Sequence, residues 1–212
     1  MTGARRHPDP VVPDVAPMLA TTGLPASNLD AWAVEAKIDG WRCRAAVEHG
    51  QLTLRTRRGR VITDLVPELH GLGKCGHDLL LDGELCAGAG RLADFAALSG
   101  RLAGKPRPGS VQLSLVVFDI MWLDGVDLTG ERFDRRRGIL CTLELAPATV
   151  IPSFPAEDAP SVLRFCEREN LEGLVLKRLA SSYTSARSGD WRKVKCAAWA
   201  EYADKRRPRQ FR

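Results

Sequence analysis

The segment that most restricts the fold is the run from Leu113 to Met121, where apolar and β-branched residues crowd a short stretch. Such a run is short for a buried helix, and β-branched side chains pack well on a pleated strand. We therefore expect a central strand here. The apolar runs Leu79–Leu81 and Leu174–Leu176 predict two more buried strands, and the first of these is expected to end in a turn at Asp82–Glu84.

A second region of short strands extends from Trp32 to Thr63, where alternating apolar and polar residues are separated by Gly40, Gly50 and Gly59. Alternation with a period of two is typical of strands, and glycine allows tight turns between them. This pattern predicts antiparallel hairpins. Trp191–Lys195 is expected to be the last strand of the chain.

Helical spacing occurs in three segments. Phe95, Leu98 and Leu102 are spaced as on one face of a helix, and Glu131–Leu145 and Pro160–Asn170 are also expected to be helical. The stripe of the last segment consists of Val162, Phe165, Cys166 and Glu169, of which only the first three are apolar. Strands and helices together predict one α+β domain, with antiparallel sheets flanked by helices.

The composition is that of a compact protein. With 212 residues and 44% hydrophobic content, the chain can build one large core. No apolar run approaches the roughly 20 residues that cross a bilayer, and the first ten residues are polar, so we expect a cytoplasmic protein without membrane contact. The six cysteines form no C-x-x-C pair and no zinc-ligand spacing with histidine, which predicts reduced, mostly buried thiols.

The two ends of the chain differ from its middle. Four prolines in the first 17 residues predict an extended lead-in over residues 1–16, followed by the folded domain over residues 17–200 and a tail over residues 201–212. The net charge is +5, and the tail carries five positive charges after residue 204, so residues 1–204 are neutral overall. Such a tail is either a solvated end or a weak contact for nucleic acid.

Lys37 is the candidate nucleophile. It lies where a predicted strand enters a glycine turn, in Glu35-Ala36-Lys37-Ile38-Asp39-Gly40. A lysine amine attacks phosphorus only when unprotonated, whereas free lysine has a pKa of about 10.4, so burial or nearby cations must favour the neutral form. The candidate cations are Arg42, Arg44, Lys193 and Lys195. Taken alone, the K-x-D-G pattern also fits an exposed lysine before a turn.

Six short segments with charged or aromatic residues follow one another along the chain. They are Lys37-Ile38-Asp39-Gly40, Thr56-Arg57-Arg58-Gly59, Asp82-Gly83-Glu84, Val117-Phe118-Asp119, Glu172-Gly173-Leu174-Val175-Leu176-Lys177 and Trp191-Arg192-Lys193-Val194-Lys195. In this order they resemble the nucleotidyltransferase motifs of ATP-dependent DNA ligases. Together with Pro17-Met18-Leu19-Ala20, they look most like bacterial ligases of the end-joining type, and the resemblance covers about Pro17 to Lys195.

The resemblance implies the nucleotidyltransferase fold shared by DNA ligases and capping enzymes, which is ATP-grasp-like and places the nucleotide between two sheets. It also implies that Lys37 becomes adenylylated by ATP and that the AMP then passes to the 5′-phosphate of nicked double-stranded DNA during repair. In the family pattern Glu35 contacts the adenine edge and Phe118 stacks on the base, a contact worth about 1–3 kcal/mol. Without the other motifs, Phe118 is simply a core side chain.

The remaining motif residues match family positions around the ribose, phosphates, metal and DNA. The resemblance implies that Arg42 and Glu84 hold the ribose and that Glu172 coordinates Mg²⁺ or Mn²⁺, for which carboxylate oxygen is suitable. Lys193 and Lys195 are expected on one strand face at the α-phosphate. The resemblance also places Lys177 near the phosphates and Arg57 on the 5′-phosphate of the nick, a role that suits a bidentate guanidinium.

The family usually continues into an OB-fold domain that closes over the site. About 17 residues follow Lys195, too few for a five-stranded barrel. A separate OB-fold polypeptide or end-joining protein, a truncated chain, and a non-catalytic module that binds nicks or nucleotides all remain open. RNA ligases and capping guanylyltransferases share the lysine chemistry and are the alternative enzyme class.

Overall fold

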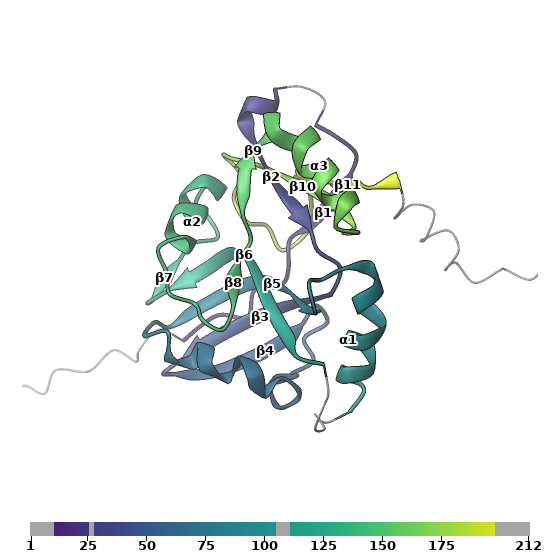
Figure 1. The fold of residues 1–212 in the computed structure, drawn as a ribbon. Coiled ribbons are helices and arrows are strands. Elements are labelled where there is room, and N and C mark those ends of the chain that lie inside the picture. Colours follow the sequence, from purple (N-terminus) through teal and green to yellow (C-terminus); the bar gives the residue numbers. More distant parts are fainter. Residues whose placement is uncertain (1–10, 26–27, 105–110, 198–212) are drawn as a thin grey trace, which may run out of the picture.

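The computed structural model describes residues 11–25, 28–104 and 111–197, which form two β-sheets (Figure 1). Sheet A has the strand order β1-β11-β10-β2-β9. Its strands are β1 (Leu19–Thr22), β2 (Trp32–Lys37), β9 (Ser153–Pro155), β10 (Gly173–Arg178) and β11 (Arg187–Lys195). The pair β1 and β11 is parallel, whereas the other neighbours in sheet A are antiparallel.

Sheet B has the strand order β4-β3-β5-β6-β7, and β8 pairs with β6 in parallel. The predicted antiparallel arrangement therefore holds for most pairs but is wrong for β1–β11 and β6–β8. The strands are β3 (Trp41–Glu48), β4 (Gln51–Thr56), β5 (Leu79–Ala87), β6 (Leu113–Leu123), β7 (Val126–Asp127) and β8 (Thr149–Val150).

Helices cover the outer faces of both sheets (Figure 1). The helix α3 (Ala159–Arg168) packs against sheet A, and α1 (Phe95–Leu102) packs against sheet B, while α2 (Phe133–Leu140) lies along β6. Short 3₁₀ segments fill the connections; these are η1 (Leu29–Ala31), η2 (Thr63–Leu65), η3 (Pro67–Lys74), η4 (Leu92–Asp94) and η5 (Ala156–Asp158). Among the described residues, no helix has the length and apolar character that crossing a membrane requires.

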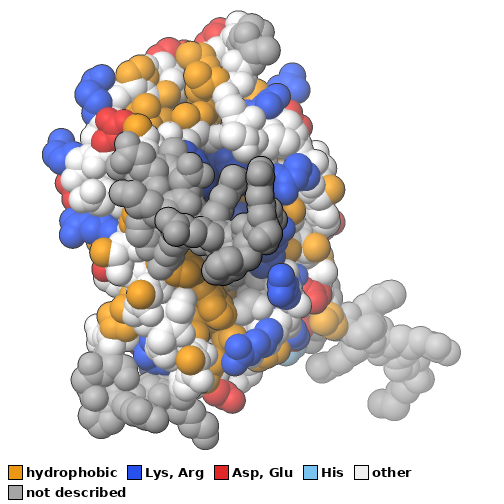
Figure 2. Space-filling view, turned by 90° about the vertical axis from the view of Figure 1, so that its right-hand side faces the viewer, with side chains coloured by type: hydrophobic (Ala, Val, Ile, Leu, Met, Phe, Trp, Pro, Cys, Tyr) orange, Lys and Arg blue, Asp and Glu red, His pale blue; other side chains and the backbone are white. Residues whose placement is uncertain are grey.

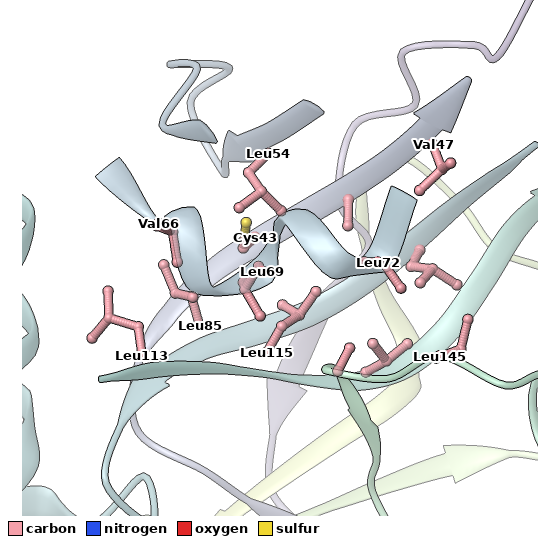
Figure 3. Close-up of a cluster of buried hydrophobic side chains, with 14 of the residues drawn as sticks. Cys43, Val47, Leu54, Val66, Leu69, Leu72, Leu85, Leu113, Leu115 and Leu145 are labelled. Carbon is pink, nitrogen blue, oxygen red and sulfur yellow. The ribbon is translucent and has the colours of Figure 1, made fainter. Parts of the chain in front are cut away.

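The largest core lies between sheet B and η3, where buried side chains from the strands meet Leu69 and Leu72 (Figure 3). Alternate residues of β3, such as Cys43 and Val47, point into this core because a strand directs successive side chains to opposite faces. Burying one such leucine contributes about 1.5–3 kcal/mol. The opposite face of β3 is left for polar side chains, beginning with Arg42.

The chain crosses from sheet A to sheet B between the end of β2 at Lys37 and the start of β3 at Trp41. Gly40 lies in this crossing, directly against β5. A Cβ atom at Gly40 would collide with the carbonyl oxygen of Leu85, so no larger residue fits without moving the backbone. The close approach fixes the position at which Lys37 leaves sheet A.

Most predicted elements are confirmed, but three strand predictions were wrong in part. The hairpin of β3 and β4 forms as predicted, whereas β2 pairs with β10 and β9 and belongs to the other sheet. The predicted turn at Asp82–Glu84 does not exist, because β5 continues to Ala87 through a register shift next to Gly83. The last strand begins at Arg187, before the predicted Trp191.

The helix predictions were correct in place but not in detail. The helix predicted over Glu131–Leu145 is shorter, since α2 spans Phe133–Leu140. In α3 the side chains of Val162 and Cys166 are buried as predicted, whereas Phe165 is 43% exposed. All six cysteines are free, and four of them are buried, in agreement with the predicted reduced thiols.

The lead-in has no regular element from residue 11 to residue 18 and packs against the polar face of sheet B. Arg44 forms an ion pair with Asp14 and donates to the carbonyl of Val15 at 2.6 Å. The extended lead-in over residues 1–16 stays a prediction. Residues 1–10 and the predicted tail, residues 201–212, lie outside the described residues, and the predicted domain boundaries stay a prediction.

Candidate active site

A cleft of about 850 Å³ lies between the polar faces of the two sheets. On one face of the molecule, Lys and Arg side chains gather around the middle (Figure 2). The cleft contains side chains from both sheets and from the β4 hairpin. The charged and aromatic lining residues are Glu35, Lys37, Trp41, Arg42, Arg57, Arg58, Arg60, Glu84, Phe95, Phe118, Lys177, Arg187, Trp191 and Lys193.

The register of sheet A brings the predicted site residues onto one face. Lys37, Gly173 and Lys195 form one cross-strand row, and Glu35, Val175 and Lys193 form the next. Residues in the same row of adjacent strands point to the same side of a sheet. The shared face that we predicted for Lys193 and Lys195 is thus also the face of Lys37 and Glu35.

At the end of β2, Lys37 lies among charged groups. Its Nζ forms an ion pair with the carboxylate of Glu172, whose other oxygen lies 3.5 Å from Lys195 Nζ. Partial burial lowers the pKa of Lys193, and the charge of Lys37 lowers it further. Three lysines around one carboxylate leave an excess of positive charge, which an anion such as a phosphate would neutralise.

Deeper in the cleft, Glu35 and Phe118 surround the amine of Lys177. Lys177 Nζ lies 2.7 Å from Glu35 Oε2 and donates to the carbonyl of Phe118 at 2.8 Å. It also lies 4.6 Å from the centroid of the Phe118 ring and 4.4 Å from that of Trp191. The structure therefore brings Lys177 together with the two residues predicted for the base, whereas the resemblance had implied a place near the phosphates.

Arg42 is held in place by a buried network. Its Nε and Nη2 atoms donate to the two oxygens of Asp82 at 2.6 and 2.5 Å, and Nη2 donates to the carbonyl of Met18 at 3.1 Å. The hydroxyl of Tyr183 donates to the same carboxylate at 2.5 Å. The guanidinium lies 4.5 Å from the centroid of Phe118, so it is fixed beside the predicted base site.

Sequence reasoning assigned no role to Asp82, Tyr183 or Trp191 individually. Asp82 and Trp191 belong to motifs that we had identified, but their side chains carried no recognisable signal of their own. Tyr183 stands outside the motifs and forms edge contacts with Trp191, with ring centroids 5.9 Å apart. Only the fold brings these three side chains from β5, β11 and the preceding loop beneath Arg42.

Glu84 lies opposite Arg42 in the register of β3 and β5. Burial raises the pKa of its carboxyl from 4.5 to about 7, although the charges of Lys37 and Arg42 lower it. The carboxyl of Glu84 therefore changes from protonated to ionised near neutral pH. Proximity to both Lys37 and Arg42 places Glu84 between the charged end of the cleft and the aromatic end.

Replacing Glu84 with glutamine is expected to raise the free energy of unfolding at pH 8 by about 1–3 kcal/mol. Because the folded-state pKa of Glu84 is raised, the contribution of this carboxyl to the free energy of unfolding is fully present below about pH 4.5. It is lost as the pH rises through about 7. The variant should lack this part of the pH dependence. Urea unfolding at several pH values measures it, with the exposed Glu157→Gln as control; parallel curves for wild type and Glu84→Gln would contradict the assignment.

Arg57 lies at the mouth of the cleft, at the end of β4. Its backbone amide donates to the carbonyl of Arg42 at 3.0 Å, and its side chain is exposed. Arg58 and Arg60 line the cleft beside it. The hairpin thus supplies a group of guanidinium donors at the rim, and the contact of Arg57 with the 5′-phosphate stays a prediction.

The described residues could hold a divalent cation through one carboxylate together with substrate phosphates and water. Among the described residues, no three acidic, histidine or cysteine side chains are grouped as a metal cage. Glu172, at 6% exposure, offers a carboxylate beside the lysines. Magnesium is commonly held by one or two carboxylates together with substrate phosphates and water, and Glu172 suits that role.

Two sheets enclosing a cleft, with a lysine at the strand end where the chain crosses between them, define a nucleotidyltransferase domain. The chain belongs to the family of ATP-dependent DNA ligase domains, which matches residues 17–195. The multifunctional non-homologous end joining protein LigD of Mycolicibacterium smegmatis is 35% identical over 187 residues, or 86% of this chain and 24% of that protein. The DNA ligase-like protein LigB from the SPbeta prophage of Bacillus subtilis is 30% identical, over 85% of this chain and 67% of that protein.

Solved structures support the same fold. Mycobacterial DNA ligase D complexed with ATP and MES matches with a TM-score of 0.68 and 30% identity, over 85% of this chain and 60% of that chain. The Chlorella virus DNA ligase-adenylate has a TM-score of 0.62 at 20% identity and shows the fold alone. The chain spans about a quarter of the length of the LigD proteins that it matches.

Proposed function

We propose that this chain carries the adenylation step of an ATP-dependent DNA ligase, with Lys37 as the nucleophile. The observation that supports it most strongly is the arrangement of the cleft. Lys37 lies among Lys193, Lys195 and Glu172, and an aromatic and carboxylate pair, Phe118 and Glu35, lines the same cleft. A mycobacterial relative has been solved with ATP, which supports the same nucleotide here.

In the first step the neutral amine of Lys37 attacks the α-phosphorus of ATP. A nitrogen–phosphorus bond forms, the bond to the bridging oxygen breaks, and pyrophosphate leaves. The carboxylate of Glu172 contacts the Lys37 amine and would orient it toward the phosphorus, and the proton that the attacking nitrogen loses would pass to water. The charges of Lys193 and Lys195 would stabilise the negative charge that builds up on the phosphate oxygens.

The base would lie beside Phe118 and Glu35. Phe118 offers a ring for stacking, and Glu35 Oε1 is a buried acceptor without a hydrogen-bond partner among the described residues, which favours a donor on the base. Arg42 and Glu84 lie between the base and Lys37, where the ribose would be. A divalent cation held by Glu172 and the phosphates would supply additional positive charge.

The second and third steps pass AMP to the 5′-phosphate of nicked double-stranded DNA and then join the strands. The 5′-phosphate oxygen attacks the phosphorus of lysyl-AMP and releases Lys37; the 3′-hydroxyl then attacks the 5′-phosphorus and releases AMP. Arg57, with Arg58 and Arg60 beside it, supports a DNA contact at the rim. The names of the end-joining relatives support a role in repair. The family resemblance implies that an OB-fold domain would close over the nucleotide.

Incubating the protein with ATP labelled at the α-phosphate, in the presence of Mg²⁺ or Mn²⁺, is expected to leave covalent label on the chain in a denaturing gel. Label in the γ-position should not be retained, because it leaves with pyrophosphate. Chasing the labelled protein with nicked DNA should move the label to the 5′ end. Failure to label at any pH, with either metal, would refute the proposal.

The same experiment separates the alternative enzyme classes. A capping guanylyltransferase would take label from GTP in preference to ATP, and an RNA ligase would transfer it to nicked RNA in preference to nicked DNA. A non-catalytic module that binds nicks would bind DNA and take no label from either nucleotide. The match to ATP-dependent DNA ligase domains favours label from ATP and transfer to DNA.

A further inference from the structure

We propose that Arg137 is a positioning residue that gives the cleft its preference for adenine over guanine, by holding Glu35 as a hydrogen-bond acceptor. The inference rests on the proposed function, since it concerns the nucleotide of the same cleft. Arg137 belongs to α2, outside every motif that the sequence revealed. Arg137 is not one of the described residues that line the cleft, so it acts on the nucleotide through Glu35.

The geometry places two cations on the two oxygens of one buried carboxylate. Lys177 Nζ lies 2.7 Å from Glu35 Oε2, and Arg137 Nη1 lies 3.7 Å from Glu35 Oε1. Arg137 is itself fixed, because Nη2 donates to the carbonyl of Ile151, a residue of the cleft wall. The second guanidinium nitrogen is therefore aimed at Glu35 from behind.

The interaction between Arg137 and Glu35 is an ion pair without a hydrogen bond. Among the described residues, neither Glu35 Oε1 nor Arg137 Nη1 has a hydrogen-bond partner, and both atoms are buried. Lys177 takes the other oxygen, so Oε1 is a buried acceptor that receives no hydrogen bond from the described residues, on a residue that lines the cleft. A buried acceptor without a partner is costly, which favours a ligand that brings a donor to it.

An ionised carboxylate distinguishes the two purines by their exocyclic groups. Adenine carries an amino group at position 6, which donates, whereas guanine carries an oxygen there, which only accepts. A carboxylate accepts from the first and repels the second. A protonated carboxyl has a donor of its own and would tolerate guanine, so the charge state of Glu35 sets the preference.

The surroundings of Glu35 have two opposing effects on the ionisation of its carboxyl group. Burial raises the pKa of Glu35, and the charge of Asp119 on β6 acts in the same direction. Lys177 from β10 and Arg137 from α2 lower it. Removing Arg137 takes away one of the two groups that keep the carboxylate ionised, so Glu35 should bind a proton at higher pH.

Equilibrium binding of ATP and GTP to the full chain, measured by calorimetry between pH 6 and 9, tests the inference. In Arg137→Met the ratio of GTP to ATP dissociation constants is expected to fall by about tenfold at pH 7, equivalent to about 1.4 kcal/mol. It should recover towards the wild-type ratio as the pH rises, whereas Arg137→Lys should stay close to wild type. The wild-type ratio should also fall as the pH is lowered.

Two comparisons isolate the role of Glu35. Glu35→Gln carries an amide that can donate, so its ratio should be low at every pH, without the recovery at high pH. Purine riboside triphosphate, which lacks the amino group, should bind wild type and Arg137→Met with similar affinity. Arg135→Met, an exposed change on the same helix, is the matched control and should leave the ratio unchanged.

If the ratio of GTP to ATP dissociation constants in Arg137→Met equalled the wild-type ratio at every pH, the inference would be overturned. An equal loss of affinity for ATP, GTP and purine riboside triphosphate would overturn it as well. Because binding is measured directly, these outcomes do not depend on covalent labelling. A chain that binds ATP selectively but takes no label would refute the proposed function and leave this inference standing. A chain that labels normally with unchanged selectivity in Arg137→Met would do the reverse.

Discussion

Lys37→Arg is expected to lose covalent labelling by ATP by roughly 10³-fold or more, the scale seen when a nucleophile is removed. A guanidinium is always protonated in proteins, so arginine cannot offer a lone pair to phosphorus. It does keep the positive charge that pairs with Glu172. The variant therefore removes nucleophilicity while preserving the charge balance of the site, which an alanine substitution would not do.

The measurement is incorporation of label from ATP labelled at the α-phosphate, with ATP binding by calorimetry and urea unfolding as companions. Lys37→Arg should bind ATP and unfold much as wild type does. Lys193→Arg is the matched control: its charge is retained one row away on the same face, and it should still take label. Substantial label on Lys37→Arg would mean that another residue is the nucleophile.

The strands that build this site were largely predictable, because their composition already indicated them. The run that contains Phe118 is confirmed as a strand of sheet B, and Lys37 lies at the end of a strand as the glycine turn at Gly40 predicted. Local pattern was sufficient for these elements. It could not tell that β2 and β3, which are adjacent in sequence, enter different sheets, because that choice depends on partners far along the chain.

The turn predicted at Asp82–Glu84 shows the same limit. Glycine between two acidic residues is typical of a turn, yet β5 continues through it, and a Cβ at Gly83 would lie 2.7 Å from the carbonyl oxygen of Val116. The glycine is required by the close approach of β6. The acidic side chains then point into the polar face of sheet B, where Arg42 binds Asp82.

The site residues that belong to sequence motifs could be predicted. The residues that act only through contacts made in the folded protein could not. The spacing of Lys193 and Lys195 indicated one face, and the register confirms it. Nothing in the sequence around Arg137 or Tyr183 indicated that these residues support Glu35 and Arg42. Their roles depend on contacts between elements that are far apart in the sequence, to which periodicity and spacing give no access.

Arg136→Met is expected to lower the free energy of unfolding by about 3–5 kcal/mol, because it leaves the buried charge of Asp119 without its partner. Both side chains are fully buried, and two parallel hydrogen bonds of 2.8 and 2.9 Å join them. Arg136 also donates to the carbonyl of Ser181 at 3.1 Å, so it ties α2 to β6 and to the loop that leads to Tyr183.

Urea unfolding measures this loss, and two further variants show its cause. Arg135→Met, whose side chain is 68% exposed, should change stability by no more than about 0.5 kcal/mol. Asp119→Asn combined with Arg136→Met should recover part of the loss, because no charge is then left unpaired in the core. If Arg136→Met cost no more than Arg135→Met, the pair would not be holding α2 against β6. Since Phe118 directly precedes Asp119, the destabilised variant should also bind ATP more weakly, which connects the buried pair to the position of the base.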